Sequence, residues 1–464
     1  MKIHHTLRSI SISYTGKNPQ FMLKNKKGDY LFLGSEKNIS KYNGFHIVKK
    51  TDRFNWTLYK IIDDIRLTSH DSAELVNHYC YFERRGHASE KFHLFDDGFV
   101  YEVKNHKGFA MLTLDMREIY DFSTDSRKYK IYKKDNCLII RYEKYPLFLA
   151  IKGIKDYQKE EKWKPFQYEY DSYRTSNKED FFIYDAIKIL IDNKARISFA
   201  ASTEEKDAID KAKKLENEKE HIIKLEDNKK IKEDETRFAN YSSQIAMERF
   251  LVDIKGTRGI YAGLPWFYHF WTRDESISLR SLILMGKYSD VKEILMRQLE
   301  NILEDGRIPN RYPFSDLGSA DGAGWVFKRL GEFIQTLRDE NIVDHYFSDG
   351  ELSMLKEKII TSIERQEKIY KKEGLIFNHQ KETWIDTTAP DGRDNREGFR
   401  IEIQSLMLNM YLLAQEIIRF TEEKSEEREQ KIYRFSEKEE EMKDKVKGMF
   451  FKDGKLADGK DDYT

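Results

Sequence analysis

Hydrophobic residues follow two different spacings along the chain, and the change falls near its middle. Up to about residue 200, short apolar and aromatic runs are separated by turn residues such as those at 27–29, 96–98 and 135–136. Aromatic and β-branched runs bounded by Gly, Asp and Asn are typical of strands. Because no helical spacing intervenes between these runs, the pattern predicts a β-sandwich domain over residues 1–202.

Residues 203–237 show a pattern in which charge dominates. Twenty-two of these 35 residues are Asp, Glu, Lys or Arg, with both signs interspersed. Mixed charge at this density favours a solvent-exposed helix with ion pairs four residues apart. We therefore expect a charged helical connector at 203–237.

From residue 238 to 464 the apolar residues fall at helical spacing, which predicts seven helices. They lie near 238–253, 274–286, 289–304, 321–340, 351–373, 400–422 and 425–449. Four of the seven prolines lie in the loops between them. Proline restricts the backbone at low entropic cost, which suits loops that build a preorganised site.

Length and composition narrow the class of protein. The 464 residues suffice for two or three domains, and 81 basic residues balance 81 acidic ones. The chain therefore has no net charge to attract nucleic acid or an anionic membrane surface. Only two cysteines, no secretory signal and no long apolar run favour a cytoplasmic protein without disulfides or a membrane span. Neither paired metal-ligand spacing nor a phosphate-binding loop occurs, so we expect no metal and no cofactor.

The loop at 265–274 concentrates aromatic and charged residues. It reads PWFYHFWTRD and contains Trp266, Trp271, Arg273 and Asp274. Sugar rings stack on Trp and Tyr, and sugar hydroxyls bind charged side chains that are held in place. Carboxylates cleave glycosidic bonds, because one protonates the leaving oxygen while a second activates water or attacks the anomeric carbon. Composition alone leaves open that the rings are a satellite core and that Arg273 and Asp274 form a surface pair.

Five sequence blocks occur in a fixed order. They are GLPWF to WTRD at 263–274, DGRIPNR at 305–311, SADGAGW at 319–325, TWID at 383–386 and RIEIQSL at 400–406. In this order they resemble the catalytic domain of amylo-α-1,6-glucosidases, the glucosidase module of glycogen debranching enzymes, which is related to glucoamylases. Five ordered blocks are a much stronger signal than any one block.

The resemblance implies an α+β multidomain protein, with a β-sandwich followed by an (α/α)6 barrel of the six-hairpin glycosidase type. The seven predicted helices at 238–464 would form only part of such a barrel. An unclosed barrel exposes a large apolar face. We therefore expect either a second polypeptide that completes the helical barrel, as in a split enzyme, or a truncated chain.

The resemblance also implies the site residues. Asp321 matches the general acid, and no residue of the chain matches the general base. The implied sugar-binding residues are Trp266, Trp271, Arg273, Asp274, Asn310, Arg311, Trp325, Trp384, Asp386 and Glu402. A helix N-terminus favours an ionised carboxylate, whereas a general acid needs a raised pKa, which burial against Trp325 would supply. Without the resemblance, Asp321 is interpreted as a helix N-cap.

The implied reaction is hydrolysis of α-1,6-linked glucose in glycogen or a branched oligosaccharide, with inversion. The chain alone is expected to have little activity. Two alternatives stay open at this point: a glucoamylase-like enzyme that acts on α-1,4 bonds, and a non-catalytic subunit that binds α-glucan.

Overall fold

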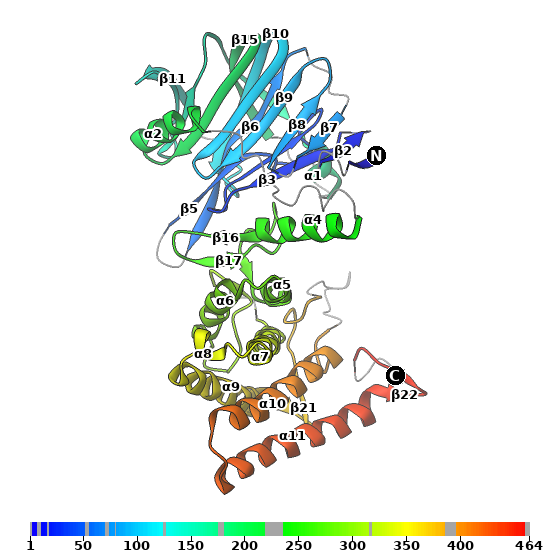
Figure 1. Ribbon diagram of the computed structural model, residues 1–464. Helices are drawn as coiled ribbons and strands as arrows, with labels where there is room; N and C mark the ends of the chain where they lie inside the picture. Colours follow the sequence, from blue (N-terminus) through cyan, green and yellow to red (C-terminus); the bar gives the residue numbers. More distant parts are fainter. Residues whose placement is uncertain are drawn as a thin grey trace. The chain divides into compact units, whose positions relative to one another are not determined.

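The computed structural model describes residues 2–6, 11–15, 18–51, 55–69, 74–78, 80–123, 127–174, 181–218, 235–314, 318–385 and 396–459. The chain divides into two compact units, Met1–Thr257 and Arg258–Thr464. Strands dominate the first unit and helices the second (Figure 1). The domain boundaries stay a prediction, because much of the connector at 203–237 lies outside the described residues.

The first unit is built on one 15-stranded sheet, and all its described ladders are antiparallel. The strands are β1 (Lys2–Thr6), β2 (Ser11–Thr15), β3 (Gln20–Lys24), β4 (Tyr30–Gly34), β5 (Gly44–Lys50), β6 (Trp56–Leu67), β7 (Glu74–Asn77), β8 (Tyr81–Arg85), β9 (Ser89–Phe95), β10 (Gly98–Glu118), β11 (Tyr129–Lys134), β12 (Cys137–Tyr142), β13 (Leu147–Lys152), β14 (Tyr157–Phe166) and β15 (Phe181–Ser202). The main path is β1-β2-β7-β8-β9-β10-β15-β13-β12-β11. The strands β3, β4, β5 and β6 form a branch that joins β10 through β6. The predicted strand-rich domain is confirmed as a large antiparallel sheet.

Alternation along the strands separates two hydrophobic cores. In β10, Phe99 and Tyr101 belong to the main core, whereas Val100 faces the opposite side of the sheet. Helix α2 (Glu205–Glu216) covers Val100 with four buried apolar residues, Ala208, Ile209, Ala212 and Leu215. We expected a solvent-exposed helix here. The structure differs because these four residues lie on one helical face and pack on the sheet.

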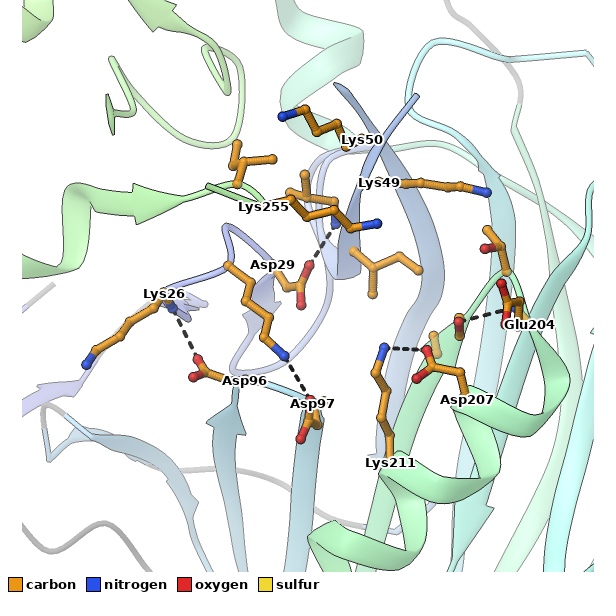
Figure 2. Close-up of a pocket in the computed structure, with 18 of the residues that line it drawn as sticks. Lys26, Asp29, Lys49, Lys50, Asp96, Asp97, Glu204, Asp207, Lys211 and Lys255 are labelled. Atoms are coloured by element: carbon orange, nitrogen blue, oxygen red, sulfur yellow. Dashed lines mark hydrogen bonds and ion pairs between the residues drawn. The ribbon is translucent and has the colours of Figure 1, made fainter. Parts of the chain in front are cut away.

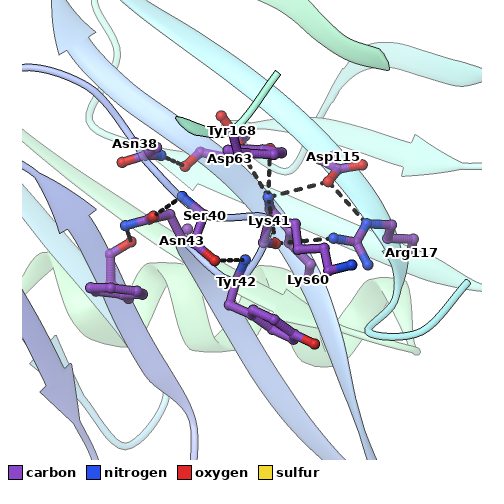
Figure 3. Close-up of polar contacts among 12 residues, drawn as sticks. Asn38, Ser40, Lys41, Tyr42, Asn43, Lys60, Asp63, Asp115, Arg117 and Tyr168 are labelled. Carbon is purple, nitrogen blue, oxygen red and sulfur yellow. Dashed lines mark hydrogen bonds and ion pairs between the residues drawn. The ribbon is translucent and has the colours of Figure 1, made fainter. Parts of the chain in front are cut away.

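A buried ion network fixes the polar loop at 35–43, which contains Lys41, to this sheet (Figure 3). Lys60 Nζ lies 2.6 Å from Asp63 Oδ1 and 3.2 Å from Asp115 Oδ2. Arg117 donates to Asp115 and to the carbonyl of Lys41, at 3.0 Å in both cases. Buried charges are tolerated when they are paired and hydrogen-bonded, so this network joins β6, β10 and the loop into one rigid part.

The second unit is helical, as the sequence predicted from its 3.6-residue spacing. The described helices are α5 (Thr272–Leu284), α6 (Tyr288–Glu300), α7 (Gly322–Asp339), α8 (Val343–Tyr346), α9 (Asp349–Tyr370), α10 (Ile401–Thr421) and α11 (Glu426–Phe450). Two further helices, α1 (Glu169–Arg174) and α4 (Glu235–Phe250), lie in the first unit. The remaining short strands are β16 (Leu251–Asp253), β17 (Arg258–Ile260), β18 (Phe270–Trp271), β19 (Arg311–Tyr312), β20 (Lys371–Lys372), β21 (Leu375–Ile376), β22 (Phe451–Lys452) and β23 (Lys455–Leu456).

Close helix packing brings three helix N-terminal ends to one side of the unit. Helix α7 packs against α5 and α10, and α10 also packs against α9 and α11 (Figure 1). A Cβ at Gly324 would lie 2.5 Å from the Cβ of Leu406, so the missing side chain allows α7 and α10 to approach each other. The loops that precede α5, α7 and α10 therefore lie close together.

Candidate active site

A pocket of about 570 Å³ opens at the N-terminal ends of α5, α7 and α10. It is lined by Ala262, Phe267, Trp271, Arg273, Asp274, Ile277, Asp321, Trp325, Trp384 and Glu402. Seven of the predicted site residues thus come together, although more than a hundred positions separate the first from the last. Their roles in binding or catalysis stay predictions.

Hydrogen bonds between two loops position the aromatic wall of the pocket. The backbone amide of Thr272 donates to the carbonyl of Asn310 at 2.9 Å, and the Thr272 hydroxyl donates to the carbonyl of Pro309 at 2.5 Å. Strand β18, which ends at Trp271, pairs with β19. The DGRIPNR block therefore holds Trp271 at the rim through backbone contacts.

Three predicted residues do not line the pocket. Asn310 is buried and contributes its carbonyl to the loop contact. Arg311 Nη1 lies 2.6 Å from Nδ1 of His269, and burial together with this guanidinium lowers the pKa of His269 to about 3. Trp266 is 36% exposed and lies outside the lining. A fourth predicted residue, Asp386, lies outside the described residues.

Asp321 is the buried carboxylate of the pocket, with 1% of its surface exposed. Its Oδ2 accepts from Arg273 Nη1 at 2.6 Å, and its Oδ1 accepts from the Ser319 hydroxyl at 3.3 Å. Its side chain does not cap α7, because Ser319 Oγ accepts the backbone N–H of Gly322 at 3.1 Å. Asp321 therefore occupies the N-cap position of α7, but its side chain makes no capping hydrogen bond.

Two opposing effects act on the proton affinity of Asp321. Burial raises its pKa because the charged form loses solvation, and the Arg273 guanidinium opposes this by favouring the ionised form. The effect of burial is the larger, so the pKa of Asp321 lies above the usual range for Asp. Burial likewise raises the pKa of Asp274 against the same guanidinium. A raised pKa is the property that a general acid requires near neutral pH.

A buried ion pair beneath the pocket anchors the start of α5. Glu275 is fully buried and both of its oxygens accept from Arg297 Nη2 at 2.7 Å. One of them also accepts the backbone N–H of Ile260 at 2.9 Å. These contacts fix the first turn of α5, which carries Arg273 and Asp274, against α6.

Two residues that the sequence did not indicate join the five sequence blocks to one another. Glu382 Oε1 lies 2.8 Å from Arg307 Nη1, and the Glu382 carbonyl accepts from the backbone N–H of Ala320 at 2.9 Å. Arg396 forms an ion pair with Glu402. No local pattern marks such residues, because their partners are distant in the sequence and meet only in the folded chain.

A second pocket, of about 630 Å³, lies within the first unit (Figure 2). Six lysines and six carboxylates line it. Asp97 lies 2.9 Å from Lys27 and 2.6 Å from Lys214, and Asp207 lies 2.6 Å from Lys211. Its one aromatic lining residue, Phe45, has no exposed surface. This pocket therefore offers no exposed aromatic ring for a sugar to stack on, in contrast to the pocket around Asp321.

Two kinds of feature are absent from the described part of the chain. It contains no group of three or more His, Cys, Asp or Glu placed to hold a metal ion. No helix in this part is both long enough and apolar enough to cross a membrane.

Comparison with known proteins finds a family match for the helical part of the chain. Residues 242–464 match the model of the family described as amylo-alpha-1,6-glucosidase. This part of the chain is similar to amylo-alpha-1,6-glucosidase domains. The match covers all the residues that line the pocket around Asp321, so the pocket lies within a domain of a glycoside hydrolase-like family. No curated protein matches the chain significantly.

The fold of the chain is similar to that of a solved enzyme. A bacterial glucoamylase in complex with acarbose has a TM-score of 0.53 and 10% sequence identity, over 95% of this chain and 62% of that chain. The chain thus spans less than two thirds of that glucoamylase. A family GH92 alpha-mannosidase from Bacteroides thetaiotaomicron has 10% identity over 93% of this chain and 58% of that chain, but its TM-score of 0.39 is too low to support a shared fold.

Proposed function

We propose that the chain is a glycoside hydrolase of the debranching type, which releases α-1,6-linked glucose from glycogen or a branched oligosaccharide with inversion. The observation that carries the proposal is the placement of Asp321, a buried carboxyl of raised pKa, among three tryptophans and an arginine in one pocket. The family of the helical domain supports the same reaction class.

Each group in the pocket has a proposed role. Asp321 donates a proton to the glycosidic oxygen as the bond to the anomeric carbon breaks. Trp271 and Trp384 provide ring faces for the apolar side of the glucose ring, and Arg273 and Asp274 bind its hydroxyls. In an inverting reaction, a second carboxylate activates a water on the opposite face of the sugar, about 6.5–9.5 Å from the acid. The resemblance assigns this general base to no residue of the chain.

We further propose that additional helices, supplied by a second polypeptide, complete an (α/α)6 barrel and contribute this base. A groove of about 490 Å³ on α5, α7 and α10, in which exposed leucines lie among charged and polar side chains, supports the idea. Leu284 is 78% exposed there and Leu412 is 44% exposed. Large exposed apolar side chains gathered on one face are typical of a surface that binds another element. The proposal includes a β-sandwich arrangement for the sheet unit and, from the two cysteines in 464 residues, a cytoplasmic location.

Glucose release tests the reaction. The chain is assayed on isomaltose-type and maltose-type oligosaccharides, with and without a candidate second polypeptide, and the anomeric form of the product is followed by NMR. Release of β-glucose from isomaltose-type substrates supports the proposal. A preference for maltose-type substrates supports the α-1,4-acting alternative. Oligosaccharide binding without glucose release under either condition supports a glucan-binding subunit.

A further inference from the structure

Arg396 lies five residues before Ile401, the first residue of α10, and all three nitrogens of its guanidinium group make contacts. It is 6% exposed. Its Nε donates to the Thr383 hydroxyl at 3.1 Å, its Nη2 pairs with Glu402 and its Nη1 pairs with Asp458. The guanidinium also lies 5.8 Å from the ring centroid of Trp384. Arg396 itself is not among the residues that line the pocket.

Two of these neighbours line the pocket from separate parts of the chain. Trp384 lies in the segment that follows β21, whereas Glu402 lies in the first turn of α10. We propose that Arg396 is a positioning residue, which holds the Trp384 ring and the Glu402 carboxylate in fixed relation to each other for sugar binding. The inference rests on the proposed function, because that function supplies the ligand of the pocket, an α-glucan oligosaccharide.

Neither pocket residue is fixed by packing alone. Trp384 is 58% exposed, so few neighbours restrict its ring. A glutamate side chain on a helix has several accessible rotamers, and an ion pair selects among them. A guanidinium has five N–H donors in a rigid plane, so one arginine can bind several partners at fixed angles. Arg396 thereby orders both residues before a sugar binds, which reduces the entropic cost of binding.

The backbone around Arg396 is itself held in place. Asn378 is fully buried, and its side-chain amide donates to the carbonyl of Arg396 at 2.5 Å. The backbone groups of Asn378 and Gly398 exchange two hydrogen bonds of 2.9 Å. Such supporting contacts are what a preorganised site requires, because the residue that orients others must not move.

Asp458 extends this arrangement away from the pocket. The Asp458 side chain is 55% exposed, and its carboxylate pairs with Arg396. The backbone carbonyl of Asp458 accepts from the backbone N–H of Ile401 at 3.0 Å. Asp458 does not line the pocket. Its Oδ2 also lies 3.8 Å from Arg400 Nη1. A change at Asp458 thus weakens the support of Arg396 without altering a residue that lines the pocket, which makes it a useful second test.

Binding measurements and fluorescence test the proposal on the full chain. The variants are Arg396→Gln, Arg396→Lys, Glu402→Gln, the double variant Arg396→Gln/Glu402→Gln and Asp458→Asn. The matched control is Arg434→Gln, which removes an ion pair between α11 and Glu364 of α9 in the same unit. Affinity for a panel of isomaltose-type and maltose-type oligosaccharides is measured by calorimetry. Acrylamide quenching of the tryptophan fluorescence is measured for each variant and for the same variant carrying Trp384→Phe. The difference between the two gives the quenching of Trp384. Thermal melting confirms that each variant is folded.

We expect Arg396→Gln to weaken sugar binding about tenfold or more and to increase quenching of Trp384. Arg396→Lys should recover part of the affinity, because it keeps the charge and loses the fork of donors. The Arg396→Gln effect should shrink in the Glu402→Gln background, since residues that act through each other are not additive. Asp458→Asn should act in the same direction with a smaller effect, and Arg434→Gln should change neither measurement.

Two results would overturn the proposal: unchanged Trp384 quenching in Arg396→Gln, or fully additive effects of Arg396→Gln and Glu402→Gln on affinity. If Arg396→Gln does not fold, Asp458→Asn takes its place, and unchanged quenching in that variant overturns the proposal. If the wild-type chain binds none of the oligosaccharides, the proposed function fails. The quenching measurement, which needs no sugar, then still decides whether Arg396 positions Trp384.

Discussion

Replacing Arg273 with methionine tests the electrostatics of the pocket most directly. The side chain of Arg273 is 18% exposed, and its Nη1 lies 2.6 Å from Oδ2 of the buried Asp321. Methionine keeps much of the aliphatic volume and removes the charge. The variant therefore leaves the Asp321 carboxylate buried without its cation.

The size of the effect follows from the geometry. Two unit charges about 4 Å apart interact by about 4 kcal/mol at an effective dielectric constant of about 20. Removal of one partner from a buried pair costs about 3–5 kcal/mol. Because Arg273 is partly exposed, we expect the lower end, a loss of about 3 kcal/mol in the free energy of unfolding at pH 8.

The loss should depend on pH, because Asp321 can take up a proton. Burial raises the pKa of Asp321 in the folded chain, and loss of the Arg273 guanidinium raises it further. A carboxyl whose pKa is higher in the folded chain stabilises the fold below its unfolded pKa, and this stability is lost as pH rises through the folded pKa. The variant should therefore lose more stability relative to the wild type at pH 8 than at pH 5.

Urea unfolding at pH 5 and pH 8, followed by tryptophan fluorescence, measures this difference. Arg280→Met on the same helix is the matched control, since Arg280 is 64% exposed and 3.9 Å from Glu332, and we expect a loss below about 0.5 kcal/mol. Arg273→Met/Asp321→Asn removes both charges and should recover most of the stability. Equal losses at the two pH values, or no recovery in the double variant, would refute the reasoning.

Three further predictions concern the pocket and its helices. In the presence of the second polypeptide, Asp321→Asn should lower glucose release by about 100-fold or more with the dissociation constant for oligosaccharides little changed, as expected for loss of a general acid; a parallel loss of binding would contradict this role. Trp384→Ala should weaken oligosaccharide binding about tenfold in calorimetry, or about 1.4 kcal/mol, because a stacking face is lost; unchanged affinity would exclude it from the sugar contact. Gly324→Ala should destabilise the fold by about 1–3 kcal/mol in urea unfolding, since its Cβ would lie 2.5 Å from the Cβ of Leu406. Gly350→Ala, which has no neighbour within 4 Å, should be neutral or slightly stabilising, and equal losses at the two glycines would contradict the packing argument.

The sequence by itself determined the type of each element and the position of most candidate residues. Strand spacing before residue 200 and helical spacing after residue 238 are local properties, since they depend only on how side chains alternate along one element. Ordered motifs placed Trp271, Arg273 and Asp321 next to the starts of helices, and Trp384 in a loop between two helices. Helix packing then brings such loops together, so the pocket residues were largely predictable.

The tertiary structure decided which of these residues face the pocket and what holds them. Arg311 contacts His269 instead of lining the pocket, and Ser319 rather than Asp321 accepts the backbone amide at the start of α7. Glu402 is paired with Arg396, which no motif indicated. These outcomes depend on contacts between segments far apart in the sequence. The charge state of Asp321 depends on them as well, because burial and a neighbouring guanidinium exist only once the helices have packed.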